Sequence, residues 1–504
     1  MSDIVLTTIN ARYVHAALGL RYLAANMGEL APRTRIVEFV LGQRAFEIVE
    51  DLLALQPRII GIGVYIWNVE ECTRVVALLK KVAPHITVVL GGPEVSYETA
   101  EQRICALADY VITGWGDVTF PKLALAVVNG AAPSTQVMPG EQPPLAQLTL
   151  PYAHYTDEDI AKRFIYVEAS RGCPFKCEFC LSALDKTAWP FELEPFMAEL
   201  EKLYARGARN LRFVDRTFNL KVAVSERILE FFLERMDDNL FMHFELIPDH
   251  LPELLKQTIV RFPPGALHFE IGIQTFNPEV QSRISRRQDD TQAEANIRWL
   301  REASNALIHV DLIAGLPGED IKSFGRGFDR LHALNPHEIQ VGILKRLRGA
   351  PIERHTEAHQ LRFNPDAPYN VLATDCIPFV DMQRISRFAR YWDLAGNSGR
   401  FHQALPLLLG NAPFDNFMRF SDWLYARTHK THEFAFERLC EFLQVHLTQV
   451  AGVDAAVASA AVLADYEASG ARGRLAFMDA GVRTRDAQSA TARARMRQVR
   501  HVTA

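Results

Sequence analysis

The sequence predicts an α/β protein made of two parallel-sheet units and a mostly helical C-terminal region. Short apolar runs alternate with helical spacing of apolar residues over residues 1–130, and the same alternation returns over residues 161–350. Alternation of this kind is typical of parallel sheets that helices cover. Beyond residue 365 the spacing of apolar residues is amphipathic, which favours helices there.

Composition limits the class of protein. The chain has 504 residues, 48% of them hydrophobic and 23% charged, which suits several buried cores. A net charge of -5 gives no general attraction to nucleic acid or anionic membranes, so we expect neither as a partner. Seven cysteines, an odd number, favour a reducing cytoplasm over a disulfide framework. The first residues lack the pattern of a signal peptide, and no apolar run reaches the ~18 residues of a membrane-spanning helix.

The N-terminal unit, residues 1–130, is predicted to be a doubly wound, flavodoxin-like sheet. Its expected strands are 4–6, 35–37, 59–64, 87–90 and 110–112. Ligands of such sheets bind beyond the carboxyl ends of the strands. Loops rich in glycine or aromatic residues follow three of these strands, at 64–67, 91–94 and 114–117. Glycine lets the backbone approach a large flat or phosphate-bearing ligand closely.

These three loops resemble those of cobalamin-binding domains. The resemblance covers about residues 1–130 and implies cobalamin contacts at Tyr65, Trp67, Gly91, Gly92, Pro93, Glu94, Gly114, Gly116 and Asp117. Proteins that bind cobalt through a histidine carry Asp-x-His-x-x-Gly after the first strand. This chain has His15 near that edge but lacks the motif. The alternative is a flavodoxin-like domain whose edge is empty or purely structural.

The second unit begins after a proline-rich segment, which predicts an extended linker over residues 131–160. Six strands are expected beyond it, at 164–168, 210–214, 242–246, 267–271, 308–313 and 338–343, with helical segments between them. In barrels built from such units, functional side chains gather at the carboxyl ends of the strands.

A loop after the first of these strands holds three thiols, Cys173, Cys177 and Cys180. Closed iron–sulfur and zinc sites take four protein ligands, and no other cysteine is near in sequence. Three ligands would leave one iron of a 4Fe-4S cluster open. The spacing, with Phe179 before the last cysteine, resembles the signature of radical S-adenosylmethionine (SAM) enzymes. In that family the open iron chelates SAM, and one electron cleaves it to methionine and a 5′-deoxyadenosyl radical. The alternatives are a zinc loop and three unrelated core cysteines.

The resemblance implies a partial (β/α)6 barrel over residues 161–350, with SAM lying across the strand ends. It implies SAM contacts at Phe179, Asp215, Arg216, Glu270, Gln274, Gly315 and Leu316. Asp215 is placed to receive the SAM ammonium and Arg216 a carboxylate. Glu270 and Gln274 alternate onto one face of their strand and could both reach the ribose or methionyl groups. The Gly-Leu-Pro-Gly-Glu turn that begins at Gly315 is expected to pack on adenine.

Basic residues gather after the sixth strand, at Lys345, Arg346 and Arg348. Two interpretations stay open: they balance the SAM carboxylate or an acidic substrate, or they form a solvated loop. Residues 365–504 are predicted to form a mostly helical domain, with helices over 382–394 and 434–447. An arginine-rich segment, 483–501, follows, and its role is not defined by the sequence.

Together the resemblances imply a cytoplasmic radical SAM enzyme that uses a 4Fe-4S cluster, SAM and cobalamin. It would methylate or rearrange an unactivated carbon of a small-molecule or peptide substrate, with flavodoxin or ferredoxin as electron donor. One alternative is a methylthiotransferase, which needs three further cysteines where this chain has only Cys72 and Cys105. Others are a non-catalytic iron–sulfur or corrinoid carrier and a zinc-stabilised structural protein.

Overall fold

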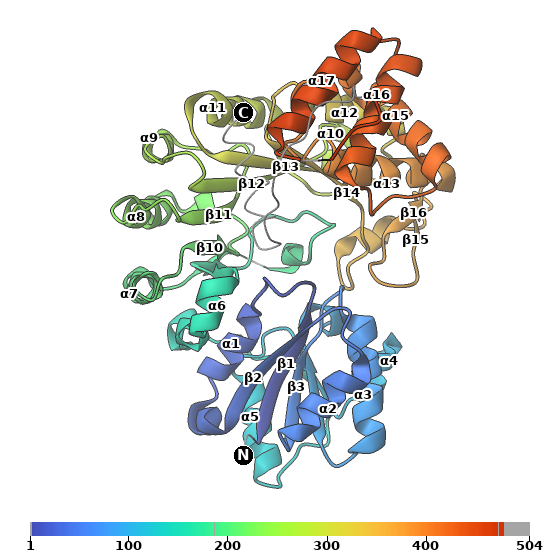
Figure 1. Cartoon of the computed structure of the whole chain (residues 1–504). Helices are drawn as coiled ribbons and strands as arrows, with labels where there is room; N and C mark the ends of the chain where they lie inside the picture. The colour runs from blue at the N-terminus through green and yellow to red at the C-terminus, as the bar shows by residue number, and fades with distance from the viewer. Residues whose placement is uncertain (1–2, 186, 472, 478–504) are drawn as a thin grey trace.

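Two six-stranded parallel sheets organise the computed structural model, which describes residues 3–185, 187–471 and 473–477. The first sheet lies at one end of the molecule, and the second sheet and the C-terminal helices lie at the other (Figure 1). This arrangement confirms the predicted fold class. Within the described residues, no helix is both long and apolar enough to cross a membrane.

The first sheet has the order β2-β1-β3-β4-β5-β6 and carries helices on both faces. Its strands are β1 (Ile4–Asn10), β2 (Thr34–Val40), β3 (Ile59–Gly63), β4 (Thr87–Gly91), β5 (Tyr110–Thr113) and β6 (Val137–Pro139). Its helices are α1 (Leu18–Ala25), α2 (Ala45–Ala54), α3 (Val69–Val82), α4 (Arg103–Leu107) and α5 (Thr119–Val128). One buried cluster joins the sheet to α2, α3 and α4, and another joins it to α1 and α5. The strands are therefore apolar toward both faces, as expected for a doubly wound sheet.

Strand β6 lies inside the segment that the sequence predicts as a linker. It pairs in parallel with β5 and adds a sixth strand to the sheet. The strand is short and largely exposed, and it ends in a proline. A short edge strand with these features has neither the alternation nor the apolar run by which strands are predicted. Helix α6 (Asp157–Lys162) follows before the second sheet begins.

The second sheet is an open, partial barrel with the order β14-β13-β12-β11-β10-β7. Its strands are β7 (Ile165–Val167), β10 (Asn210–Phe213), β11 (Phe241–Leu246), β12 (Leu267–Gln274), β13 (Leu307–Ala314) and β14 (Glu338–Ile343). The connecting helices are α7 (Leu193–Ala205), α8 (Val222–Leu233), α9 (Glu253–Ile259), α10 (Pro278–Arg283), α11 (Asp290–Ala303) and α12 (Ile321–His332). All six predicted strands are present, and every neighbouring pair is parallel. The carboxyl ends of the strands therefore meet at one edge.

The C-terminal region packs beside β14 and α12 (Figure 1). A small antiparallel pair comes first, formed by β15 (Arg362–Phe363) and β16 (Val371–Ala373). Five helices follow in the described part: α13 (Phe379–Leu394), α14 (Ala404–Leu409), α15 (Pro413–Thr428), α16 (Phe436–Gln449) and α17 (Ala455–Ala468). The predicted helical character is confirmed for the described part, and the arginine-rich segment 483–501 lies outside it.

Ion pairs join the loop after β4 to the loop after β14. Arg348 Nε lies 3.0 Å from Glu94 Oε1, and both Arg346 and Arg348 contact Glu98, at 3.0 and 2.7 Å. The hydroxyl of Tyr369 donates to Glu94 at 2.7 Å. Arg346 and Arg348 therefore pair with glutamates that follow strand β4 of the first sheet, and these pairs connect the N-terminal unit to the loop after β14.

Candidate functional site

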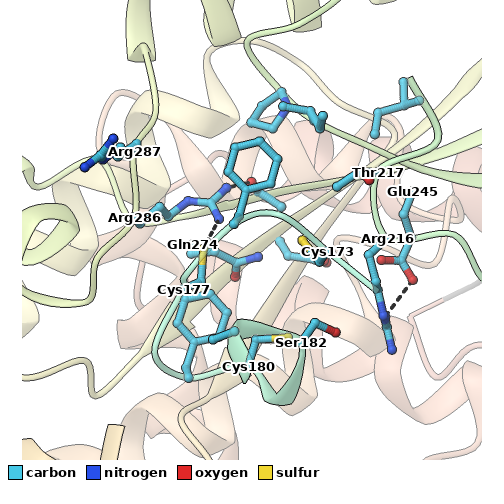
Figure 2. Close-up of a pocket in the computed structure, with 18 of the residues that line it drawn as sticks. Cys173, Cys177, Cys180, Ser182, Arg216, Thr217, Glu245, Gln274, Arg286 and Arg287 are labelled. Carbon is cyan, nitrogen blue, oxygen red and sulfur yellow. Dashed lines mark hydrogen bonds and ion pairs between the residues drawn. The ribbon is translucent and has the colours of Figure 1, made fainter. Parts of the chain in front are cut away.

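The three predicted cysteines line one cavity of about 260 Å³ at the carboxyl edge of the second sheet (Figure 2). They come from the loop between β8 (Ser170–Arg171) and β9 (Trp189–Pro190), which pair with each other. Gly172 enters this loop with a φ of +87°, and a Cβ there would lie 2.5 Å from the carbonyl oxygen of Thr187. The loop therefore requires glycine immediately before Cys173.

The other four cysteines lie away from this cavity. Cys72, Cys105 and Cys440 are buried elsewhere, and Cys376 is exposed. Among the described residues, no three His, Cys, Asp or Glu side chains are arranged to hold a single metal ion. A four-iron cluster is larger than one ion, so this finding does not bear against it. Three free thiols facing one cavity, without a fourth, fit a cluster that keeps one iron open to a ligand.

Charged and polar side chains from four adjacent strands wall the same cavity. Parallel pairing puts Glu245 of β11 beside Glu270 of β12, and Gly272 beside Asp311 of β13. Arg216, which follows β10, contacts Glu245 with 2.8 Å between Nη1 and Oε1 (Figure 2). The cavity thus offers both carboxylates and a guanidinium within reach of the cysteines, which suits a zwitterionic ligand.

Histidines on the same strands shift the pKa values of two of these carboxylates. Burial alone would raise the pKa of Glu270, but His243, with Nε2 3.3 Å from Oε2, and His309 lower it to about 2. Burial and the charge of Glu270 raise the pKa of Asp311 to about 6. Burial opposes the charging of His309, yet Asp311, 3.1 Å away, and Glu270 raise its pKa to about 9. The two carboxylates that line the cavity are thus coupled to histidines on the same strands.

The structure brings four of the seven predicted SAM residues to this cavity. Phe179, Arg216, Glu270 and Gln274 line it together with the cysteines. The other three, Asp215, Gly315 and Leu316, do not.

Each of those three has a structural position elsewhere. The carboxylate of Asp215 accepts hydrogen bonds from the Ala169 amide at 3.0 Å and the Ser170 hydroxyl at 2.6 Å. Leu316 is fully buried, and a Cβ on Gly315 would lie 2.5 Å from Val371 Cγ1. Their proposed SAM contacts stay predictions.

Sequence reasoning missed the side chains that hold the cysteine loop. Glu178, which lies between Cys177 and Cys180 in sequence, is buried. Its carboxylate contacts Arg354, His355 and Ser285. Arg286 donates from Nη1 to the Cys177 sulfur at 3.4 Å (Figure 2). Glu178 was visible as a charged residue inside the cysteine motif. Arg286 had no such signal, because it is 109 residues from Cys177 in sequence.

A second cavity, of about 340 Å³, opens at the carboxyl edge of the first sheet. Six of the nine predicted cobalamin residues line it: Tyr65, Gly91, Gly92, Gly114, Gly116 and Asp117. Gly92 has a φ of +109°, and a Cβ there would lie 2.5 Å from the Val64 carbonyl oxygen. Within the described residues that wall the cavity there is no histidine; the Nδ1 atom of His15 instead lies 2.6 Å from the Tyr166 hydroxyl. The wall is mostly glycine, aliphatic and aromatic side chains, with Asp117, Glu168 and Arg171 as its charged members. It fits a large flat ligand held without a protein imidazole.

The remaining three predicted residues lie outside this wall. Trp67 is half exposed and stacks on Tyr65, with ring centroids 4.5 Å apart. Glu94 is buried and pairs with Arg348. Pro93 begins a short 3₁₀ turn ahead of Glu94.

Arg171 connects the second cavity to the loop that carries the cysteines. It lines the second cavity and precedes Cys173 by two residues. Its guanidinium lies 3.0 Å from Asp117 Oδ2 and 2.7 Å from Glu168 Oε1, and it packs over the rings of Tyr22 and Trp115. The wall of the glycine-lined cavity is therefore continuous with the cysteine loop.

Comparison with family models decides what the two units are. Residues 4–124 match the B12 binding domain, and residues 167–331 match the Radical SAM superfamily. The chain carries a B12-binding domain followed by a radical SAM domain. A radical SAM domain implies a 4Fe-4S cluster and SAM, and a B12-binding domain implies cobalamin. Residues 357–472 match a protein family of unknown function, DUF4080.

Several known proteins are similar to this chain in sequence. The cobalamin-dependent radical SAM methyltransferase TokK of Streptomyces tokunonensis is 24% identical over 362 residues, which cover 62% of this chain and 51% of TokK. An uncharacterized methyltransferase of Pyrococcus horikoshii is 28% identical over 229 residues, which cover 40% of this chain and 49% of that protein. The chain thus spans about half the length of these curated relatives.

A solved structure shares the fold. The radical SAM methyltransferase TsrM from Kitasatospora setae, with cobalamin and a 4Fe-4S cluster bound, superposes with a TM-score of 0.57. The match covers 73% of this chain and 82% of TsrM at 18% identity. This chain therefore shares its fold with TsrM over most of its length.

Proposed function

We propose that this chain is a cobalamin-dependent radical SAM methyltransferase that acts on an unactivated carbon of a small-molecule or peptide substrate. One observation carries the proposal. Three cysteines without a fourth face a cavity walled by strand-end charges, and Arg171 links their loop to the glycine-lined cavity of the B12-binding domain. The names of TokK and of the 2-(S-pantetheinyl)-carbapenam-3-carboxylate methyltransferase of Streptantibioticus cattleyicolor support methylation.

The groups that these domains imply supply the difficult chemistry: a bound cluster donates one electron for the cleavage of SAM, and cobalamin carries a methyl group. Cys173, Cys177 and Cys180 would hold the cluster. Arg216 would bind the SAM carboxylate, because guanidinium and carboxylate pair bidentately. Glu270 is ionised at neutral pH, as its lowered pKa requires, and would accept hydrogen bonds from the SAM hydroxyl or ammonium groups.

The B12-binding domain would hold cobalamin by shape. Gly91, Gly92 and Gly114 leave the backbone open at the sheet edge, and Tyr65 closes one side of the cavity. Since no histidine is among the described residues that line this cavity, the chain would leave cobalt without an imidazole ligand. An external flavodoxin or ferredoxin is the proposed electron donor, because the described chain shows no second group of cysteines.

Anaerobic reconstitution with iron and sulfide, followed by SAM, hydroxocobalamin and dithionite, tests this function. The proposal expects 5′-deoxyadenosine and S-adenosylhomocysteine, and a corrinoid absorbance that stays with the protein through gel filtration. A Cys180→Ala variant, treated identically, should give no 5′-deoxyadenosine. An intact cluster that yields neither product from SAM would contradict the proposal.

A further inference from the structure

Arg286 is the one side chain outside the cysteine loop, among the described residues, with a hydrogen bond to a cluster cysteine sulfur. Its Nη1 lies 3.4 Å from Cys177 Sγ, and its Nη2 donates to the carbonyl of Gly272. Nη2 also lies 2.8 Å from Gln288 Oε1. The guanidinium is therefore held by two neutral oxygens and by the sulfur.

The backbone on both sides fixes this geometry. Helix α10 ends in a Schellman motif: the Arg286 amide donates to the Gln281 carbonyl at 2.8 Å, and Ser285 takes the left-handed conformation with a φ of +55°. The Ile284 carbonyl accepts from the Glu178 amide at 3.0 Å. The end of α10 thus docks directly on the cysteine loop.

Strand β12 supplies the other anchor. Its register against β13 shifts between Gly272 and Gln274, and Gln274 has a φ of +70°. A bulge of this kind re-aims the groups beside an active site. Here the Gly272 carbonyl, at the bulge, accepts from Arg286.

The charge of Arg286 is not cancelled by a carboxylate. Arg216 in the same cavity pairs with Glu245, whereas within the described residues Arg286 forms no ion pair. One-electron reduction adds a negative charge to a cluster and its thiolates. A cationic donor to one of those sulfurs stabilises the reduced state more than the oxidised state.

We propose that Arg286 tunes the cluster of the radical SAM domain: its hydrogen bond to the Cys177 thiolate raises the cluster's reduction potential. The inference rests on the proposed function only in that a cluster must bind these cysteines. Its consequence is that a weaker physiological reductant suffices to charge the cluster.

Potentiometric titration of the reconstituted holoenzyme, followed by electron paramagnetic resonance, tests this inference. Arg286→Gln should lower the reduction potential, with the equilibrium constant for reduction falling about tenfold, or about 59 mV. Arg286→Lys keeps the charge but loses the fixed geometry, so its potential should fall between those of wild type and Arg286→Gln.

Arg287→Gln is the matched control. Arg287 lines the same cavity but is directed away from the sulfurs (Figure 2). Equal shifts for the two glutamine variants would reduce the effect to general charge and overturn the inference, as would an unchanged potential in Arg286→Gln. If that variant assembles too little cluster, the Arg286→Lys potential decides: a value equal to wild type contradicts the proposal. Failure of the proposed function would appear separately, as wild-type enzyme that forms no 5′-deoxyadenosine.

Discussion

The two parallel sheets prepare their edges for ligands in different ways. The first sheet is apolar on both faces, and the cavity at its carboxyl edge is lined mostly by glycine and apolar side chains, with Arg171 paired to the carboxylates of Asp117 and Glu168. The second sheet directs titratable side chains into the barrel, where closed barrels of this type are usually filled by branched apolar residues. His243, His268 and His309 stand on three adjacent strands beneath the carboxylates of Glu270 and Asp311.

This difference matches the two ligands that the domains imply. A large flat cofactor can be held by shape, so the first sheet needs close backbone approach, and its charged side chains at this edge pair with one another. SAM is small and charged, so the second sheet must present fixed charges at defined strand ends. Four predictions test this difference between a cavity that binds by close backbone approach and a cavity that binds through charged side chains.

The largest effect is expected at the three cysteines that we propose as ligands of the cluster. Cys177→Ala should abolish stable cluster binding and all cleavage of SAM, because two thiolates cannot anchor the cluster against solvent. Iron and sulfide content per chain and the absorbance of the cluster measure this. Cys376→Ala removes an exposed thiol outside the cavity and should retain full iron content. Equal iron loss in both variants would contradict the assignment of Cys177 as a cluster ligand.

The second-largest effect is expected at the ion pairs between the loop after β4 and the loop after β14. Arg348→Ala would leave the carboxylate of Glu94, which is 4% exposed, with the Tyr369 hydroxyl as a donor but without its cationic partner, costing about 3 kcal/mol. Lys122→Ala breaks an exposed pair with Glu141 and should cost about 0.5 kcal/mol. Denaturation midpoints, with hydrogen exchange of residues 93–98, compare the two. The account fails here if Arg348→Ala is as mild as Lys122→Ala.

The charges inside the barrel should appear as a pH dependence. Asp311 and Glu270 raise the pKa of His309 from 6.5 to about 9, so its contribution is complete below pH 6.5 and is lost as pH rises through about 9. The stability difference between wild type and His309→Gln should therefore shrink between pH 6 and 10, because the charged His309 is then lost from wild type.

His268→Gln is the opposite case. Burial and the neighbouring His243 and His309 hold the pKa of His268 well below its usual value, so wild type should lose stability relative to this variant as pH falls below 6.5. Thermal midpoints across pH measure both trends. If the thermal midpoints of both variants follow those of wild type in parallel across pH, the two histidines do not contribute through their charge.

The smallest effect is expected at the glycine-lined cavity of the first sheet. Gly92→Ala should cost about 2 kcal/mol, because its positive φ and the nearby Val64 carbonyl both oppose a Cβ. It should also weaken cobalamin binding. Gly42 has a similar φ of +99°, but no atom would lie within 4 Å of a Cβ there. Gly42→Ala should therefore cost only the backbone strain and leave cobalamin binding unchanged. Titration with hydroxocobalamin distinguishes them, and equal affinities would refute binding by shape.

Sequence patterns predicted the strands that are buried and apolar, because those patterns record burial. They did not predict β6, β8 or β9, whose few residues are positioned by pairing and not by burial. The cysteines were evident because one loop contains all three. Arg286 and Arg354 were not, since both reach the cysteine loop from distant segments that only the fold brings there. Arg348 was visible as a basic residue, but its partner Glu94 could not be inferred across 254 positions.

The central claim is that the polypeptide leaves one iron uncovered for SAM in the cavity of Cys173, Cys177 and Cys180. Electron–nuclear double resonance of the reduced cluster, with isotope-labelled SAM amino nitrogen and carboxylate oxygen, tests it most directly. The account predicts hyperfine coupling to both labels in wild type. Tightly bound SAM that shows coupling to neither label would contradict the account.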